Sequence, residues 1–394
     1  MRLPLPALAF VFLAAGGGGA GASCGGNFSD FLVTLRQEAY DLGYHNSLLN
    51  AFFDEVQPNP KVIKADRSQS IFQKDFITFS KALISENRLT NARKNARIYA
   101  DTFKLGIDKF GVPPEVLLAF WAFETDFGAN QGNFNTLNSL ITLAHDCRRP
   151  DLFRPQIFAA LELFRRGDFD PAQTKGAWAG EIGMIQILPR DIIESGTDGD
   201  GDGYVDLQQS VPDALMTGGL ILKRLGWQVN EPWLQEIELP KSLDWSMTGL
   251  DKTYPVSLWK ALGVTARNGA LFDNSSQASV LLPVGHKGPA FLAYPNFSVY
   301  FGWNQSLVYV TTAAYFATIL SGEPTYEVGA TDKGLNALQM QDIQKNLIRL
   351  GHNVGITDGI LGSKTRAAVQ AEQQRLGFPA DAWPTPGLLS RLSR

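Results

Sequence analysis

Glu124 is the residue of this sequence best placed to carry acid–base chemistry, because it ends an apolar stretch that runs from Val116 to Phe123. A helix that is apolar on every side is buried, and carboxylates are rarely buried without a partner or a function. Burial raises the pKa of a carboxylic acid toward the value that a general acid needs near neutral pH. A structural hydrogen bond near a helix end would explain the same residue. Asp126 lies about 200° further round the helix, so Glu124 acts without a paired carboxylate on its face.

Alternating carboxylates and glycines between residues 198 and 206 have the composition of a cation-binding loop. Aspartates at positions 1, 3, 5 and 9, glycine at position 6 and a backbone carbonyl at position 7 match a calcium loop of EF-hand type. Position 12 is Gln209 instead of glutamate, so we expect the closing ligand to come from further along the chain. The expected calcium ligands are Asp198, Asp200, Asp202, Tyr204 and Asp213. A plain solvated turn is the alternative.

A glycine-rich stretch at residues 176–189 stands directly before this loop and could contact a ligand. Its glycines allow close backbone approach, Gln186 could bind a hydroxyl or amide, and Trp178 could stack on a sugar. Trp303, Asn304 and Tyr309 offer similar groups later in the chain. Packing alone would explain each of these residues equally well. The four histidines show no metal-binding spacing, and the sequence has no nucleophile elbow, P-loop or dinucleotide fingerprint.

The first 23 residues have the pattern of a secretory signal peptide. Arg2 precedes an apolar stretch that is too short to cross a bilayer, and small residues follow it. The remaining chain of about 370 residues is long enough for two or more domains. A net charge of −4 makes nucleic acid and anionic membrane surfaces poor partners for the protein as a whole.

The two cysteines, Cys24 and Cys147, allow two interpretations. Cys24 follows the expected cleavage point and could carry a lipid anchor, but Gly21 stands where a lipid-attachment motif has an aliphatic residue. In an oxidising compartment the two cysteines could instead form a disulfide. Closing a loop of about 120 residues would stabilise the fold by about 4–5 kcal/mol in the chain-entropy model. We favour the disulfide, although the sequence does not establish that the two sulfurs meet.

The elements that would position these residues are mostly helical from residue 28 to about 320. Residues 87–109 predict one basic amphipathic helix, and residues 115–126 an apolar one opened by Pro113-Pro114. Residues 231–300 are rich in proline and aromatic residues, and short apolar runs at 279–282 and 298–301 predict a small strand-containing insert. An apolar helix is expected at 309–320.

Residues 323–332 predict a linker, and residues 333–394 a separate helical unit. Within that unit, residues 358–369 read D-G-I-L-G-S-K-T-R-A-A-V, with the second helix beginning near Ser363. This motif resembles that of the first peptidoglycan-binding domain family. The resemblance implies a three-helix module that keeps the protein near cell-wall glycan.

Several segments, in order over about residues 25–322, resemble lytic murein transglycosylases of the membrane-bound B type. Residues 123–128 are similar to the family's catalytic E-T-x-[FW]-G segment, and residues 178–189 to its W-A-G-x-x-G-x-x-Q-F-x-P motif. The Asp loop followed by 211–214 resembles its calcium site, and 296–304 its late N-F…Y-N segment.

The resemblance implies a mainly α, lysozyme-like catalytic domain over residues 24–322, acting on peptidoglycan in the periplasm. Glu124 would act first as acid and then as base, so that the MurNAc 6-hydroxyl attacks C1 and leaves a 1,6-anhydro end. Calcium is expected to be structural. We expect a monomer, and a peripheral association with the membrane stays open.

The sequence also departs from the family pattern at residues that could line a glycan cleft. Ile187, Ile221 and Trp303 replace common aromatic residues, and 190–193 replaces a polar stretch. These departures leave open a non-catalytic wall-binding scaffold. A second alternative is a hydrolytic muramidase, which needs a second carboxylate near Glu124, and Glu181 is the motif-borne candidate for it.

Overall fold

The computed structural model describes residues 24–68, 74–272 and 277–393. The expected signal peptide therefore lies outside the described residues. The described chain divides into two compact units: residues 24–68 with 94–225, and residues 74–93 with 226–393. The first unit contains Glu124, Gln186 and the Asp loop. The expected division into catalytic domain, linker and module stays a prediction.

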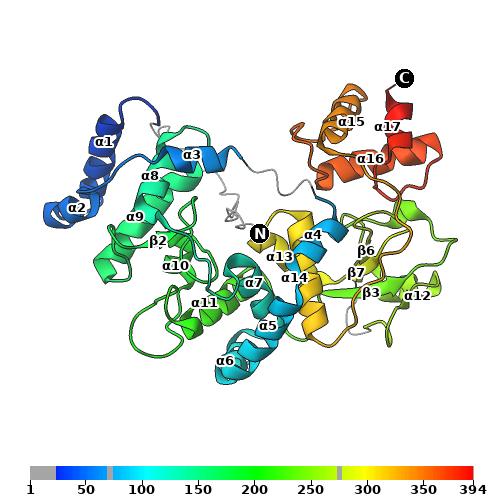
Figure 1. Ribbon diagram of the computed structural model, residues 1–394, viewed down its shortest axis with the longest axis horizontal. Coiled ribbons are helices and arrows are strands. Elements are labelled where there is room, and N and C mark those ends of the chain that lie inside the picture. The colour runs from blue at the N-terminus through cyan, green and yellow to red at the C-terminus, as the bar shows by residue number, and fades with distance from the viewer. Residues whose placement is uncertain (1–23, 69–73, 273–276, 394) are drawn as a thin grey trace. The chain divides into compact units, whose positions relative to one another are not determined.

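The first unit is built almost entirely from helices, and Figure 1 shows α8 and α9 lying side by side within it. Helix α9 also packs on α10, and α11 packs on α6 and α7. One short antiparallel pair, β1 with β2, joins Phe134 to Gly176. The elements are α1 (Phe28–Asp41), α2 (Asn46–Phe53), α3 (Pro60–Asp66), α6 (Ala100–Phe110), α7 (Pro114–Thr125), β1 (Phe134–Asn135), α8 (Thr136–His145), α9 (Pro150–Arg166), β2 (Lys175–Gly176), α10 (Pro189–Ser195) and α11 (Val211–Arg224).

Helix α7 forms where the paired prolines and the apolar run predicted it. Pro114 occupies its first turn, where the missing N–H costs no hydrogen bond. Every residue from Val116 to Phe123 is buried. The helix ends because Asp126 and Phe127 both adopt left-handed backbone conformations, with φ of 54° and 60°. Glu124 therefore lies in the last turn of a buried helix.

The basic segment 87–109 is two helices and not one. Helix α5 (Glu86–Ile98) ends before Tyr99, which has a non-helical backbone and caps α6. The Tyr99 ring meets the Trp121 ring edge-on, with centroids 5.7 Å apart. The break therefore falls at a residue whose ring contacts α7.

The second unit contains the predicted strand-bearing insert. Its five strands form an antiparallel sheet in the order β4-β6-β7-β3-β5, with Val280 paired to Leu292 and Ile237 paired to Ala290. Helix α14 packs on β3, α4 and α13. The elements are α4 (Phe76–Leu83), β3 (Leu234–Glu238), a 3₁₀ turn (Trp245–Met247), β4 (Tyr254–Pro255), α12 (Val256–Ala261), β5 (Thr265–Ala266), β6 (Gln277–Leu281), β7 (Ala290–Ala293), α13 (Pro295–Trp303) and α14 (Leu307–Leu320).

The run at 298–301, which was expected to form a strand with the insert, is helical. It lies within α13, which Pro295 opens at the first turn. Asn296, Phe297, Val299, Tyr300 and Trp303 are all buried, at spacings that suit a helix enclosed on several sides. A short apolar run does not distinguish a buried strand from a buried helix, and proline decides this case.

Within the second unit, the C-terminal residues form the three helices that their motif predicted. They are α15 (Ala337–Arg349), α16 (Ser363–Leu376) and α17 (Pro386–Leu392). Asn336 and Gln339 form a reciprocal capping box at the start of α15. Ile343, Leu347 and Val369 lie at the centre of the core that joins these helices. None of the helices in the described part of the chain has the length and apolar character needed to cross a bilayer.

Candidate active site

Glu124 is partly exposed, whereas the eight residues before it are buried. The sequence predicted a buried carboxylate, and the structure corrects this: the side chain leaves the apolar core at the end of α7. The reason is the left-handed turn at Asp126, which ends the helix just after Glu124. A carboxylate in this position reaches a ligand from a rigid support, as a group that transfers protons must.

Thr125 ties the end of α7 to the glycine-rich stretch. Its hydroxyl donates to the carbonyl of Met184 over 2.6 Å and accepts from the N–H of Gly128 over 2.8 Å. Thr125 is 1% exposed, so water does not compete for these bonds. The backbone beside Glu124 is thereby fixed to the segment that carries Gln186. Sequence reasoning gave Thr125 no role, although a threonine among apolar neighbours at a helix end was a usable signal.

The segment around Gln186 is a tight turn. Ile182 and Ile187 exchange backbone hydrogen bonds of 2.8 and 3.2 Å, and Gln186 adopts a left-handed φ of 51°. Gly183 has a φ of 79°, and a Cβ there would stand 2.5 Å from the carbonyl oxygen of Leu207. Glycine is therefore required at residue 183, where the turn meets the end of the Asp loop.

The amide of Gln186 is held by the protein itself. Its Nε2 donates to the carbonyls of Gly183 (2.7 Å) and Gln131 (3.1 Å), and the side chain is 3% exposed. Gln131 in turn donates through its own Nε2 to the carbonyl of Gln208. These bonds join three segments: the loop between α7 and β1, the turn, and the residues after the Asp loop. Gln131 was not singled out from the sequence, and no local signal marks it.

Glu181, the second carboxylate of this region, is completely enclosed. It is 0% exposed, and neither carboxylate oxygen makes a hydrogen bond of normal geometry among the described residues. Burial raises the pKa of Glu181 to about 7, and the nearby backbone N–H groups of Glu181 and Ala179 and the charge of Arg149 oppose part of that shift. Glu181 and Glu124 are thus two glutamates of one unit in opposite environments.

The aromatic candidates are part of the cores of their units. Trp178 is 5% exposed in the first unit, whereas Trp303 and Tyr309 are 1% and 0% exposed in the second. Asn304 is 5% exposed, and its Oδ1 accepts from the N–H of Ser306 at the start of α14. Their predicted contacts with substrate stay predictions.

The Asp loop brings three of its predicted ligands together. One oxygen from each of Asp198, Asp200 and Asp202 lies within 4.8 Å of the others, and all three residues are exposed. The N–H groups of Gly203 and Gly201 hold the pKa of Asp198 below its usual value, so that its carboxylate stays charged. Oxygen donors in this arrangement suit a hard cation such as Ca²⁺.

Asp213 holds the backbone of the loop, and its predicted role as a calcium ligand stays a prediction. It is 1% exposed, and its two oxygens accept the N–H groups of Gly199 and Asp206, each over 2.8 Å. Asp213 therefore clamps both ends of the loop onto α11 and lies outside the group of three aspartates. The side chain of Tyr204 is exposed, and the predicted coordination by its backbone carbonyl stays a prediction. The loop is joined to the Gln186 turn by a 2.8 Å bond from Met184 N–H to the Leu207 carbonyl.

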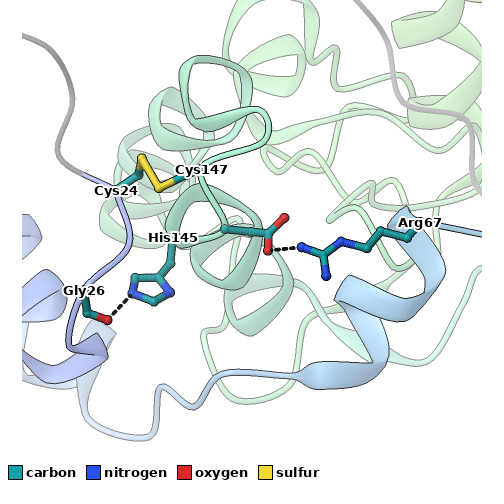
Figure 2. The surroundings of a disulfide bond; sticks show 6 residues. Cys24, Gly26, Arg67, His145 and Cys147 are labelled. Atoms are coloured by element: carbon teal, nitrogen blue, oxygen red, sulfur yellow. Dashed lines mark hydrogen bonds and ion pairs between the residues drawn. A yellow bond between two sulfur atoms is a disulfide. The ribbon is translucent and has the colours of Figure 1, made fainter.

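Cys24 and Cys147 form a disulfide in the first unit. Figure 2 shows it beside His145, whose ring is hydrogen-bonded to the Gly26 carbonyl. The N–H of Gly25 also donates to the His145 carbonyl over 2.8 Å. The start of the described chain is therefore fixed to the end of α8.

Comparisons with known proteins identify the two families that the sequence motifs resemble, and their matches together cover nearly the whole chain. The family described as Transglycosylase SLT domain matches residues 27–318, and a peptidoglycan binding domain matches residues 336–392. Membrane-bound lytic murein transglycosylase B of Escherichia coli K12 is 27% identical over 241 residues, which are 59% of this chain and 64% of that protein. The chain thus matches less than two thirds of this curated relative.

Two solved structures extend the comparison. SltB3 from Pseudomonas aeruginosa, in complex with NAG-anhNAM-pentapeptide, is 34% identical, with a TM-score of 0.86 over 94% of this chain and 100% of that chain. Slt35 of Escherichia coli, in complex with calcium, is 22% identical, with a TM-score of 0.64 over 76% of this chain and 96% of that chain. At 22% identity, the likeness to Slt35 shows a shared fold alone.

Proposed function

The chain belongs to the transglycosylase SLT domain family, and from this premise we propose that it is a peptidoglycan lytic transglycosylase. It would cleave the β-1,4 bond between MurNAc and GlcNAc and leave a 1,6-anhydroMurNAc end. The observation that carries the proposal is Glu124, a partly exposed carboxylate whose backbone is bonded through Thr125 to the Gln186 turn. The SltB3 relative was solved with a fragment that carries such an anhydro sugar.

The proposed reaction needs one residue that first gives and then takes a proton. Glu124 protonates the glycosidic oxygen as the bond to C1 breaks. The 6-hydroxyl of the same MurNAc then bonds to C1, and its proton returns to Glu124. No water is consumed, and Glu124 ends in its starting state. One carboxylate is therefore sufficient.

The enclosure of Glu181 argues against a hydrolytic muramidase. A hydrolase that inverts or retains configuration needs a second carboxylate in contact with water or with the sugar. Glu181 was the motif-borne candidate for that role, and it is 0% exposed. The bonded network around Gln186 also argues against a decayed cleft, because its buried hydrogen bonds keep the Glu124 segment in place.

Muropeptide analysis of purified sacculi tests this proposal. We expect the wild-type protein to release 1,6-anhydro-muropeptides and Glu124→Gln to release at least about 100-fold less, the usual loss for a general acid–base. Glu115→Gln is the matched control, since it removes another partly exposed glutamate of the same helix. Its products should be those of the wild type.

Three other results would each contradict the proposal in a different way. Reducing MurNAc ends without anhydro sugar would identify a hydrolase. Equal activity of Glu124→Gln would remove Glu124 from the reaction. Binding to sacculi without release by either protein would identify a wall-binding scaffold.

We further propose that Asp198, Asp200 and Asp202, with the Tyr204 carbonyl, hold a structural calcium ion. Ca²⁺ would neutralise three neighbouring carboxylates in a loop that the Met184–Leu207 bond joins to the Gln186 turn. The proton transfers are assigned to Glu124 alone.

The proposed location is the periplasm, with residues 1–23 as the signal peptide and the C-terminal module on the cell wall. The disulfide supports this, because such bonds persist in oxidising compartments. It also occupies the Cys24 thiol, which a lipid anchor would need. The protein would then act without a lipid anchor.

A further inference from the structure

A cavity of about 620 Å³ lies inside the second unit, between the C-terminal module and the elements beside it. Its walls come from the first residues of α4 and α14, from the segment before α15, and from the 359–362 turn. A second cavity of about 310 Å³ shares Gln305, Leu307, Gly362 and Arg366 with it. These volumes are in the range of pockets that bind small ligands.

Buried polar bonds beside the cavities join the C-terminal module to the insert. Gln370 of α16 donates to the carbonyls of Thr248 (2.8 Å) and Trp245 (3.1 Å) in the insert. Asp381 accepts from the backbone N–H of His286 over 3.1 Å and is paired with its ring over 2.6 Å. Gln370 and Asp381 are each 5% exposed. These bonds hold the module against the insert, beside the cavity.

Positive groups surround the larger cavity. Lys74, Lys333 and Arg366 line it, and no ion pair in the described part of the chain involves any of the three. Asp75 also lines it, but its carboxylate caps α4 by accepting from the N–H and the hydroxyl of Thr78. The lining of the larger cavity thus carries three cations against the one carboxylate of Asp75. The lining of the smaller cavity has two acids, Asp251 and Asp381, and two bases, Lys364 and Arg366, so we place the anion in the larger one.

Arg366 is the deepest of these cations. Its terminal nitrogens donate to the carbonyls of Pro283 (2.6 Å) and Leu282 (3.2 Å), while its Nε is buried without a partner among the described residues. Burial lowers the pKa of Arg366 to about 10, and the nearby Asp381 carboxylate opposes part of that shift. An anion in the cavity would stabilise that charge.

The start of α16 adds to the same positive field. Gly362 caps this 14-residue helix without a side-chain acceptor, and no acidic residue lies in the first turn. Gly362 and the turn before it line the cavity. Free N–H groups at a helix start favour anions. The aromatic side chain present, Trp383, is 8% exposed and so offers little face for stacking a sugar.

We propose that this cavity binds a free carboxylate of a peptidoglycan stem peptide. The inference rests on the proposed function, which brings peptide-bearing glycan to the protein, and it assigns the module a peptide in place of the glycan chain. Leu307 and Leu361 would contact the small apolar side chains of such a peptide.

Calorimetric titration of the full-length protein tests this. The probes are a synthetic stem pentapeptide with free carboxylates, the same peptide with its carboxylates amidated, and a peptide-free chitin tetrasaccharide. We expect the free pentapeptide to bind, and amidation to weaken binding at least about 5-fold. The double variant Lys74→Gln/Lys333→Gln should give a similar loss, as expected for about 1 kcal/mol of ion pairing. Lys345→Gln is the matched control, because this exposed lysine of α15 does not line the cavity.

The inference is overturned if the free pentapeptide does not bind, if the amidated peptide binds equally well, or if the double variant binds like the wild type. Tetrasaccharide binding that the double variant weakens would also overturn it, in favour of glycan. The sacculus assay separates this result from the proposed function. Anhydro-muropeptide release without carboxylate-dependent binding rejects only the peptide site, whereas binding without release rejects only the lytic reaction.

Discussion

Glu124 and Glu181 show how the environment of a single residue assigns its role. Glu124 leaves the core at a helix end and is partly exposed, so it can exchange a proton with a ligand. Glu181 lies in the same unit but is fully enclosed, and its pKa is raised to about 7 by burial. A carboxyl group in that position makes the stability of the protein depend on pH, and it is not placed to react with a ligand.

Glu181 should make the protein less stable as pH rises from about 4.5 to about 7. In this range the unfolded chain releases the proton of Glu181 while the native state keeps it, so the free energy of unfolding falls. A shift from 4.5 to about 7 corresponds to about 3 kcal/mol. Glu181→Gln should remove this contribution, and its melting temperature should fall less than that of the wild type between pH 4.5 and 8.

The comparison concerns the slope with pH and not the absolute stability, because glutamine brings its own buried amide. The pKa of Asp191 is also raised, to about 6, chiefly by burial, but this group is present in both proteins and cancels. Glu55→Gln, at an exposed position, serves as control and should follow the wild type. Identical pH profiles for Glu181→Gln and wild type would show that Glu181 is already ionised in the native state.

At the scale of elements, a loop, a turn and a helix end form one connected support. The Asp loop meets the turn through Met184 and Leu207, and the turn meets α7 through Thr125. Asp213, in the first turn of α11, holds the loop through two backbone N–H groups. A cation bound in the loop would therefore stabilise the segment that carries Gln186 without contacting the reacting bond.

Removal of calcium should lower stability more than it changes the chemistry. At a calcium concentration 100 times the Kd, binding contributes about 2.7 kcal/mol, which corresponds to roughly 5–10 °C in melting temperature. We expect EDTA to lower the melting temperature of the calcium-loaded protein by this amount, and the products from sacculi to keep their anhydro ends. Thermal melts with and without EDTA measure the effect.

Asp200→Asn is the matched variant, since it removes one of the three clustered carboxylates. Its melting temperature should respond less to calcium and to EDTA than that of the wild type. If EDTA leaves the wild-type melting temperature unchanged, the loop is an ordinary turn. If EDTA abolishes cleavage at a temperature where the protein is folded, the ion has a role beyond structure.

At the scale of the whole molecule, the chain forms two compact units that are not continuous in sequence. In the first unit, a disulfide joins Cys24 to Cys147, which are 123 residues apart. Asp66, which is 2% exposed, accepts from Arg148 and Arg149 just after Cys147. The disulfide therefore joins the chain start to a segment that is already anchored.

Loss of the disulfide should lower the stability of the first unit by about 4–5 kcal/mol, because the unfolded chain regains the entropy of a long loop. The expected fall in melting temperature is roughly 10 °C or more. Cys24→Ala/Cys147→Ala should match the wild type measured in reductant, and reductant should have no effect on the variant.

Thiol labelling distinguishes the disulfide from a lipid anchor. The native protein should resist alkylation and react at both cysteines only after unfolding and reduction. A labelled Cys147 in unreduced protein would show that Cys24 is engaged elsewhere. An unchanged melting temperature in reductant would show that the bond adds no stability.

Several features followed from the sequence alone, since they depend on residues close together in the chain. Proline opened α7, the alternation of aspartate and glycine produced the clustered carboxylates, and the D-G-x-x-G motif preceded α16. Each of these patterns sets backbone conformation or side-chain periodicity within about a dozen residues. The mainly helical fold, the small sheet and the family relationship were predicted on this basis and are confirmed.

Other features were decided only by tertiary packing. The sequence placed Glu124 in the core and left Glu181 as a second acid, whereas the structure exposes the first and encloses the second. It indicated Asp213 only as a calcium ligand, and did not show that both of its oxygens accept backbone N–H groups of the loop. The physical reason is the same in each case: burial and long-range hydrogen bonds depend on which elements meet, and local pattern carries no record of the partner.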